Sequence, residues 1–118
     1  MFIDTIRLTE QAKNQLIKVK RKTKIENWNV LCRWAICLSL SDPKPVRDAG
    51  LKNRSSVEMS WKVFGGELAD VYEALIRERL HKDNGVSSKD NLARLFDLHL
   101  HRGISYLEND YMKIFCKK

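Results

Sequence analysis

The sequence predicts a mainly α-helical fold with minor β-structure, organised as a single compact domain over residues 1–118. A chain of 118 residues can build one hydrophobic core and is too short for two ordinary domains. Its composition, with 43% apolar and 31% charged residues but only five glycines and two prolines, is typical of helix-rich globular proteins. Apolar residues recur at helical spacing through most of the chain, whereas apolar and polar residues alternate only in two short segments.

The N-terminal region is expected to form a short strand followed by two helices. In Phe2–Leu8, apolar and polar side chains take opposite faces and several residues are β-branched, which favours a strand. Thr9 follows at an N-cap position, so a first helix should run from about Glu10 to Lys22. The apolar side of this helix consists of Ala12, Leu16 and Val19.

The second helix is expected to run from a cap at Asn27 to about Leu40. Pro43 disfavours helical geometry at the residue before it and therefore ends this helix. Residues Val46–Ser56 are polar, show no period and are expected to form a loop. The inward stripe of the helix is expected to consist of Leu31, Trp34, Ala35 and Leu38.

The alternation of apolar and polar residues over 57–64 predicts a short extended segment, which Gly65 and Gly66 stop. A strong helical period then predicts a core helix over about Glu67–Lys82. Its apolar positions are Leu68, Val71, Tyr72, Leu75, Ile76 and Leu80.

The C-terminal region is expected to be helical as well. Ser87 and Asp90 resemble a capping box at the start of a helix that Gly103 can end. One more amphipathic segment, Ile104–Phe115, and a basic tail, Lys117–Lys118, complete the chain.

The net charge of +7 is concentrated in one segment of the chain. Between Gln11 and Ile25 there are six basic residues and no acidic one, whereas acidic and basic residues nearly balance elsewhere. A concentrated basic patch attracts phosphates by releasing condensed counterions, while a solvated helix face usually carries acidic neighbours that relieve repulsion. The pattern therefore favours binding of a polyanion. The basic residues are Lys13, Lys18, Lys20, Arg21, Lys22 and Lys24, and Arg33 is a possible addition from the second helix.

The three cysteines are expected to be reduced and largely buried. Cys32 and Cys37 lie within an apolar helical pattern, and Cys116 makes the number odd. A metal or iron–sulfur site would require His99 or His101 as a fourth ligand, at a spacing that matches no known site. We therefore expect no metal and no other cofactor.

No segment is long and apolar enough to suggest a membrane span, because the longest apolar stretch, Trp34–Leu40, is far shorter than about 20 residues. The N-terminal residues do not resemble a secretory signal, so we expect a cytoplasmic protein.

The sequence offers no positive case for an enzyme. Gly65 and Gly66 lack the Gly-Lys-Ser/Thr that a phosphate-binding loop requires. The acidic residues Glu67, Asp70 and Glu73 could hold a metal, but nearby arginines make surface ion pairs the simpler interpretation.

The histidine pair in the C-terminal half has a similar structural interpretation. His99 and His101 are two residues apart and would point to different sides of a helix. His99 continues an apolar stripe, which favours a hydrogen-bonded, partly buried histidine over a general base.

Four segments of the chain together resemble the DndE family, the small subunit of bacterial DNA phosphorothioation systems. They are "IRLTEQAKNQLIKVKRKTKI" (6–25), "NWNVLCRWAICLSL" (27–40), "WKVFGGELADVYEAL" (61–75) and "LHLHRGISYL" (98–107). The resemblance covers nearly the whole chain. It implies a role in sulfur modification of DNA beside subunits that supply cysteine desulfurase, iron–sulfur and ATPase functions.

The expected function is therefore that of a non-catalytic, homo-oligomeric subunit that contacts the sugar-phosphate backbone of double-stranded DNA, with little sequence specificity. A nicked duplex is a hypothetical preferred ligand. One alternative is an adaptor that assembles the other modification subunits. Another is a ribbon-helix-helix transcriptional regulator, since a strand before two helices is the order of that module, whose strand pairs across a dimer.

Overall fold

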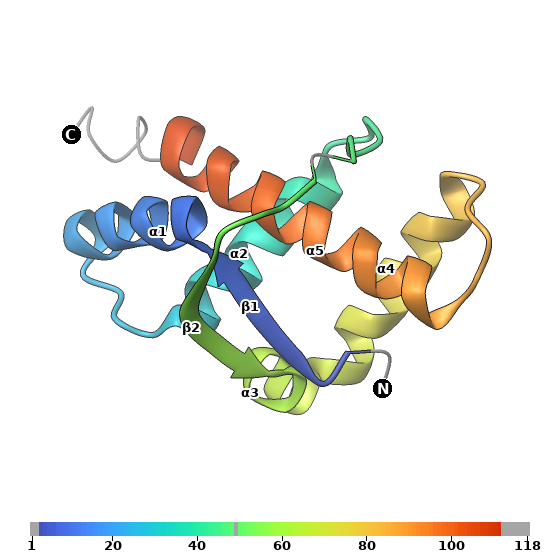
Figure 1. Cartoon of the computed structure of the whole chain (residues 1–118), viewed down its shortest axis with the longest axis horizontal. Helices are drawn as coiled ribbons and strands as arrows, with labels where there is room; N and C mark the ends of the chain where they lie inside the picture. Colours follow the sequence, from blue (N-terminus) through green and yellow to red (C-terminus); the bar gives the residue numbers. More distant parts are fainter. Residues whose placement is uncertain (1–2, 49, 112–118) are drawn as a thin grey trace.

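A computed structural model of the chain describes residues 3–48 and 50–111 (Figure 1). Its strands are β1 (Thr5–Thr9) and β2 (Arg54–Ser60). Its α-helices are α1 (Glu10–Thr23), α2 (Trp28–Ser41), α3 (Trp61–Gly65), α4 (Ala69–Lys82) and α5 (Lys89–Tyr106). A 3-10 turn, η1 (Gly66–Leu68), precedes α4, and a π-helical turn, η2 (Leu107–Tyr111), follows α5. The predicted class, mainly α with minor β, is confirmed.

The N-terminal strand pairs within the chain. β1 and β2 are antiparallel, with Ile6 opposite Met59 and an irregularity between Arg7 and Thr9. The predicted strand is confirmed from Thr5, although Phe2 lies outside the described residues. Because β2 supplies the partner strand, β1 does not need a second subunit to form a sheet.

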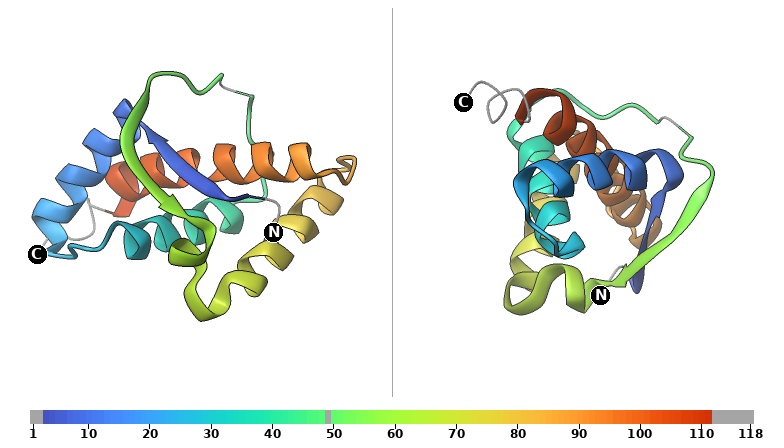
Figure 2. Two further views of the ribbon diagram at one scale, coloured as in Figure 1. Left: turned by 60° about the horizontal axis from the view of Figure 1, so that its bottom comes forward. Right: turned by 90° about the vertical axis from the view of Figure 1, so that its left-hand side faces the viewer.

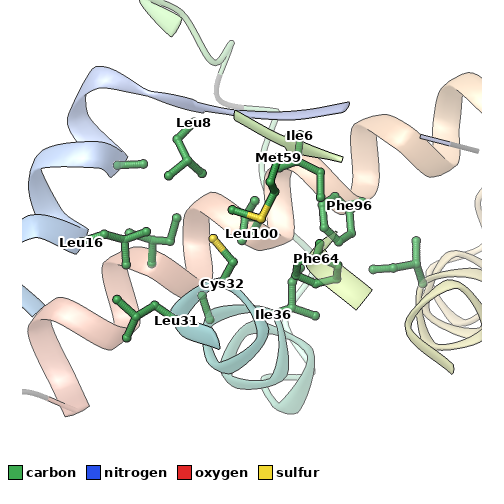
Figure 3. Packing of buried hydrophobic residues seen from close by; sticks show 14 of the residues in the cluster. Ile6, Leu8, Leu16, Leu31, Cys32, Ile36, Met59, Phe64, Phe96 and Leu100 are labelled. Atoms are coloured by element: carbon green, nitrogen blue, oxygen red, sulfur yellow. The ribbon is translucent and has the colours of Figure 1, made fainter. Parts of the chain in front are cut away.

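The hydrophobic core lies between the sheet and α2, with α5 running between them (Figure 2). From the sheet, Ile6, Leu8 and Met59 point inward and meet Phe96 and Leu100 of α5 (Figure 3). The opposite side of the core comes from α2, with Leu31, Cys32 and Ile36, and from α1, with Ala12, Leu16 and Val19.

The extended segment predicted for residues 57–64 is wrong in its position. The strand begins three residues earlier, at Arg54, and the chain turns into α3 at Trp61. Ser60 causes this change, because its hydroxyl accepts the N–H of Val63 at 3.1 Å and caps the new helix. Trp61 then packs edge-on against Phe96 of α5, with 5.2 Å between ring centroids.

The inward stripe of α2 differs from the predicted one at Trp34, whose side chain is exposed. Leu31 and Ala35 are buried as predicted, but Cys32, Ile36 and Ser39 take the other buried positions, because the helix is covered on two sides. Burial raises the pKa of the Cys32 thiol to about 12. Cys37 is exposed, contrary to the prediction, and Cys116 lies outside the described residues.

The predicted helix over residues 67–82 is confirmed from Ala69 onward, but its apolar side is only partly buried. Ile76 and Leu80 face the core, and Tyr72 packs edge-on against Phe64 of α3, with 5.1 Å between ring centroids. Three further apolar side chains are exposed instead of buried: Leu68, Val71 and Leu75.

The start and the end of α5 both differ from the prediction. Ser88, not Ser87, caps the helix, and its hydroxyl accepts the N–H of Asn91 at 3.1 Å. Gly103 does not end the helix, which continues to Tyr106. Gly103 instead lies where α5 crosses α2 closely, since a Cβ atom there would be 1.8 Å from the carbonyl oxygen of Ala35. The predicted Ile104–Phe115 segment is helical to Tyr111, and its remainder and Lys117–Lys118 lie outside the described residues.

Two arginines hold the C-terminal end of α2. Arg79 of α4 donates to the carbonyls of Leu40 (3.1 Å), Asp42 (2.7 Å) and Lys44 (2.8 Å). Arg102 of α5 donates to the carbonyls of Ser39 (2.8 Å) and Lys44 (2.7 Å). These guanidinium groups satisfy backbone acceptors that a helix end leaves without partners, and they fix three helices to one another.

A buried serine joins Arg102 to His99. Arg102 Nε donates to Ser39 Oγ at 2.9 Å, and Ser39 Oγ lies within hydrogen-bond distance of His99 Nδ1, at 2.7 Å. His99 Nε2 has no hydrogen-bond partner among the described residues. Burial, with Arg79 and Arg102 nearby, lowers the pKa of His99 to about 3. His99 is hydrogen-bonded as predicted, but it is fully buried instead of partly buried.

We predict that Gly103→Ala destabilises the protein by about 3 kcal/mol or more, because a methyl group cannot fit against the Ala35 backbone without separating α5 from α2. Urea unfolding measures the change. Gly50→Ala is the matched control: its φ is +58° but nothing lies within 4 Å of the added Cβ, so it should cost only about 1 kcal/mol. Equal effects of the two substitutions would contradict the close crossing.

We predict that His99 makes the protein lose stability as pH falls from 6.5 toward 3. In that range the histidine of the unfolded chain binds a proton and the buried one does not, so the free energy of unfolding rises with pH. Denaturant unfolding across this range should show a shallower pH dependence for His99→Gln than for the wild type. His81→Gln, at an exposed histidine, should retain the wild-type dependence. An unchanged slope in His99→Gln would contradict the prediction.

Candidate nucleic-acid interface

The basic residues of the sequence lie on α1, and the ends of this helix are well defined. At its start, Thr9 Oγ1 accepts the N–H of Ala12 at 3.1 Å, as the N-cap prediction requires. At its end, Lys24 adopts a left-handed conformation (φ 66°), and its N–H donates to the Lys20 carbonyl at 2.9 Å. The predicted helix is confirmed and extends one residue further, to Thr23.

The buried side of α1 determines where its cations lie. Ala12, Leu16 and Val19 are in the core, so the basic side chains occupy the remaining surface of the helix. Lys18, Arg21, Lys22 and Lys24 are exposed, and Lys13 and Lys20 are half-buried. Three of the six fall in the last turn of the helix, where cations also stabilise the helix dipole.

Three of these cations meet at one hollow where α1 turns into α2. The hollow has a volume of about 690 Å³ and is open to solvent. It is lined by Ile17, Lys20, Arg21, Lys24, Glu26 and Asn27. Lys20 Nζ lies 4.3 Å from the ring centroid of Trp28, a cation–π contact that holds this side chain at the edge of the hollow. The sequence interpretation missed Trp28, although an aromatic residue one turn from a basic run is a signal for such a contact.

Lys18 lies on another side of α1 and is partly neutralised. Its Nζ is 3.6 Å from Glu108 Oε2 of η2, but the lysine side chain remains 68% exposed. Such an exposed pair contributes little to stability and can exchange for a phosphate. Five of the six cations therefore lie in the C-terminal half of α1 or at its C-cap, which form the basic end of α1 with Lys18 at its margin, whereas Lys13 lies in the first turn.

Arg33 does not line the basic hollow. Its guanidinium donates to the carbonyl of Phe64 and, at 3.3 Å, to that of Val63, both in α3. Gly66 keeps this site open, since a Cβ there would be 3.0 Å from Arg33 Nη2. The geometry gives Arg33 a contact that joins α2 to α3.

Two of the groups considered for metal binding or catalysis, Glu73 and His101, are occupied by structural contacts. Glu73 accepts from Arg77 at 3.1 Å, the ion pair that the sequence predicts. His101 Nε2 accepts the N–H of Thr9 at 3.2 Å, and His101 Nδ1 lies 2.8 Å from the Asp97 carbonyl. The imidazole of His101 therefore has different partners from that of His99, which contacts Ser39. Within residues 3–48 and 50–111, no three His, Cys, Asp or Glu side chains are grouped as metal ligands. In the same ranges, no helix is long and apolar enough to cross a membrane.

The fold and this surface define a class of small helical proteins with a two-stranded sheet and one strongly basic helix end. The chain belongs to the DndE family, since the family model described as DNA sulphur modification protein DndE matches residues 5–113. It is thus a member of a family of DNA sulfur modification proteins.

Solved structures share the fold. The crystal structure of DndE from Escherichia coli B7A, involved in DNA phosphorothioation modification, has a TM-score of 0.73 and 21% sequence identity, covering 92% of this chain and all of the other. A G21/24K mutant of DndE has a TM-score of 0.65 and 17% identity, covering 88% of this chain and 97% of the other. No curated protein matches the sequence.

We predict that Arg33→Ala destabilises the protein by about 1–3 kcal/mol, because two carbonyls of α3 lose a charged donor. Thermal or urea unfolding measures the change. Lys62→Ala is the control: Lys62 is an exposed cation of α3, the helix that carries the two carbonyls, and its replacement should change stability by less than about 0.5 kcal/mol. If Arg33→Ala left stability unchanged but weakened DNA binding, Arg33 would instead be a DNA contact.

Proposed function

We propose that this protein is a non-catalytic DNA-binding subunit of a DNA phosphorothioation system. The basic end of α1 contacts the sugar-phosphate backbone of double-stranded DNA and reads little sequence. The observation that supports the proposal most is the convergence of Lys20, Arg21 and Lys24 on one open hollow, with only Glu26 as an acidic neighbour. Membership in a sulfur-modification family makes DNA the most plausible polyanion.

Several features of α1 suit contact with a phosphate backbone. Lysine and arginine side chains on an exposed helix reach phosphates at different positions without base-edge geometry, which gives affinity with little specificity. Lys13, Lys18 and Lys22 extend the charged surface along and around the same helix. Replacing oxygen by sulfur at phosphorus requires access to the backbone, so the proposed preferred ligand is a nicked duplex.

We predict that Lys20→Glu combined with Lys22→Glu lowers affinity for duplex DNA at least about tenfold and reduces the slope of log affinity against log salt by about 2. The loss follows from removing two phosphate contacts. Fluorescence anisotropy over a salt series measures both quantities, with intact, nicked and single-stranded DNA of the same sequence as ligands.

Lys62→Glu is the matched control, because it reverses an exposed cation of α3, away from α1 (Figure 1). It should leave the salt slope unchanged. Unaltered binding by the α1 double variant would overturn the proposed interface, and equal affinity for all three DNA forms would remove the preference for nicks.

An adaptor function is the second candidate, and one observation favours it. Leu68, Val71 and Leu75 form an exposed apolar stripe on η1 and α4, with exposed fractions of 55%, 50% and 42%. Exposed apolar stripes of this kind mark protein interaction surfaces. Acidic residues border the stripe, so it differs in chemistry from the basic end of α1.

We predict for the adaptor function that Val71→Glu with Leu75→Glu prevents co-purification with other modification subunits while DNA binding is retained. Arg77→Glu on the same helix controls for charge alone. If DNA binding depended on the α4 stripe and subunit assembly on α1, the assignment of the two surfaces would be reversed.

The alternative of a ribbon-helix-helix regulator predicts tight binding to one palindromic operator. In that module the strand pairs across a dimer, whereas β1 pairs with β2 of the same chain and does not need an intersubunit partner.

A further inference from the structure

A second hollow lies between the first turns of α1, the segment after α2 and one side of α5. Its volume is about 410 Å³, within the range of sites that hold small molecules. It involves the N-terminal half of α1, whereas the basic hollow lies at the C-terminal end of this helix. The two hollows share no lining residue.

The charged residues that line this second hollow are all basic. They are Lys44, Arg47 and Arg102, and no carboxylate of the described residues lines the hollow. Arg102 is held by the carbonyls at the end of α2 and contributes a fixed positive charge. Lys44 and Arg47 are exposed, and their side chains form no ion pair in the described ranges. The hollow therefore offers two available cations, backed by a third, to an anionic group.

Neutral polar groups add hydrogen-bonding capacity on the α1 side. Gln15 Nε2 donates to Ser105 Oγ at 3.3 Å and to Glu108 Oε1 at 3.1 Å, which leaves the Gln15 carbonyl oxygen as an acceptor. Ser105 accepts in that contact, so its hydroxyl hydrogen is available to donate. Gln11 lines the hollow one turn earlier.

The remaining wall is apolar and includes an aromatic ring. The Tyr106 hydroxyl donates to Asp42 Oδ2 at 2.6 Å, and Arg102 lies 5.5 Å from its ring centroid, so the ring is fixed on two sides. The other apolar lining residues are Ala12, Pro45, Val46, Leu51 and Leu98. A ligand that fits this hollow has an anionic end, a flat or apolar body, and edges that hydrogen bond to amides.

We propose that this hollow binds a nucleoside 5′-monophosphate unit. The phosphate meets Lys44 and Arg47, and the base lies along the apolar wall within reach of Gln11 and Gln15. A free nucleotide and an unpaired nucleotide of a DNA strand present the same chemistry. Binding of an unpaired DNA nucleotide rests on the proposed DNA-binding function, whereas binding of a free nucleotide does not.

NMR titration of the full chain with deoxyadenosine monophosphate tests the proposal. We expect saturable shifts of the Val46 and Ser105 amides, and binding at least about tenfold weaker for deoxyadenosine and for inorganic phosphate, since each lacks half of the contacts. Lys44→Ala with Arg47→Ala should weaken nucleotide binding at least about tenfold. Lys52→Ala, in the same connecting segment but outside the lining, is the matched control.

Absence of saturable shifts, unchanged affinity in the double variant, or phosphate binding as tight as the nucleotide would each overturn the proposal. A duplex with a 5′-phosphorylated single-stranded overhang, compared with a blunt duplex, identifies the source. If DNA supplies the nucleotide, the overhang binds more tightly and Lys44→Ala with Arg47→Ala removes that advantage; if the two duplexes bind equally, the free nucleotide is the ligand.

The same measurements separate this proposal from the proposed function. Lys20→Glu with Lys22→Glu should weaken binding of both duplexes while leaving the nucleotide titration unchanged. A protein that binds the nucleotide but neither duplex would retain this site and lose the proposed DNA-binding function.

Discussion

The close crossing of α5 over α2 is the constraint on which the rest of the structure depends. Gly103 allows α5 to approach the backbone of Ala35 closely, and any side chain at position 103 would clash with that backbone. This approach brings Ser39, His99 and Arg102 into contact and lets Arg79 and Arg102 reach the carbonyls at the end of α2. Because Ser39 Oγ contacts both His99 Nδ1 and Arg102 Nε in this buried region, the crossing has one well-defined geometry.

The position of α1 follows from this helix pair. His101, on the outer side of α5, accepts the N–H of Thr9 and so fixes the junction of β1 and α1. The buried side of α1 packs on the same core, which leaves its basic side chains and its C-terminal turn at the surface. The hydrogen bond at one end of α1 and the short turn into α2 at the other thus fix the helix relative to the core and determine where its cations leave the backbone.

Local signals were enough to predict some elements and not others. For α1, the cap at Thr9, the apolar spacing and the end near Lys22 all depend on residues close in sequence, so the prediction was correct. Gly103 was predicted to end a helix and Trp61 to lie in an extended segment, but both lie within helices, because glycine and tryptophan occur in more than one structural setting. A glycine can end a helix or permit a close crossing, and only the contact with Ala35 distinguishes the two. Arg33 was grouped with the basic run, but its carbonyl partners in α3 are about 30 residues away in sequence.

NMR mapping with a duplex ligand tests whether the basic end of α1 is the surface that meets DNA. Titrating the labelled full chain with duplex DNA should shift the amides of Lys18 to Lys24 and Asn27 first and most, and added salt should reverse the shifts. The amides of Val71 and Leu75 on α4 should remain unchanged. Shifts confined to α4, or shifts on α1 that persist at high salt, would contradict the account.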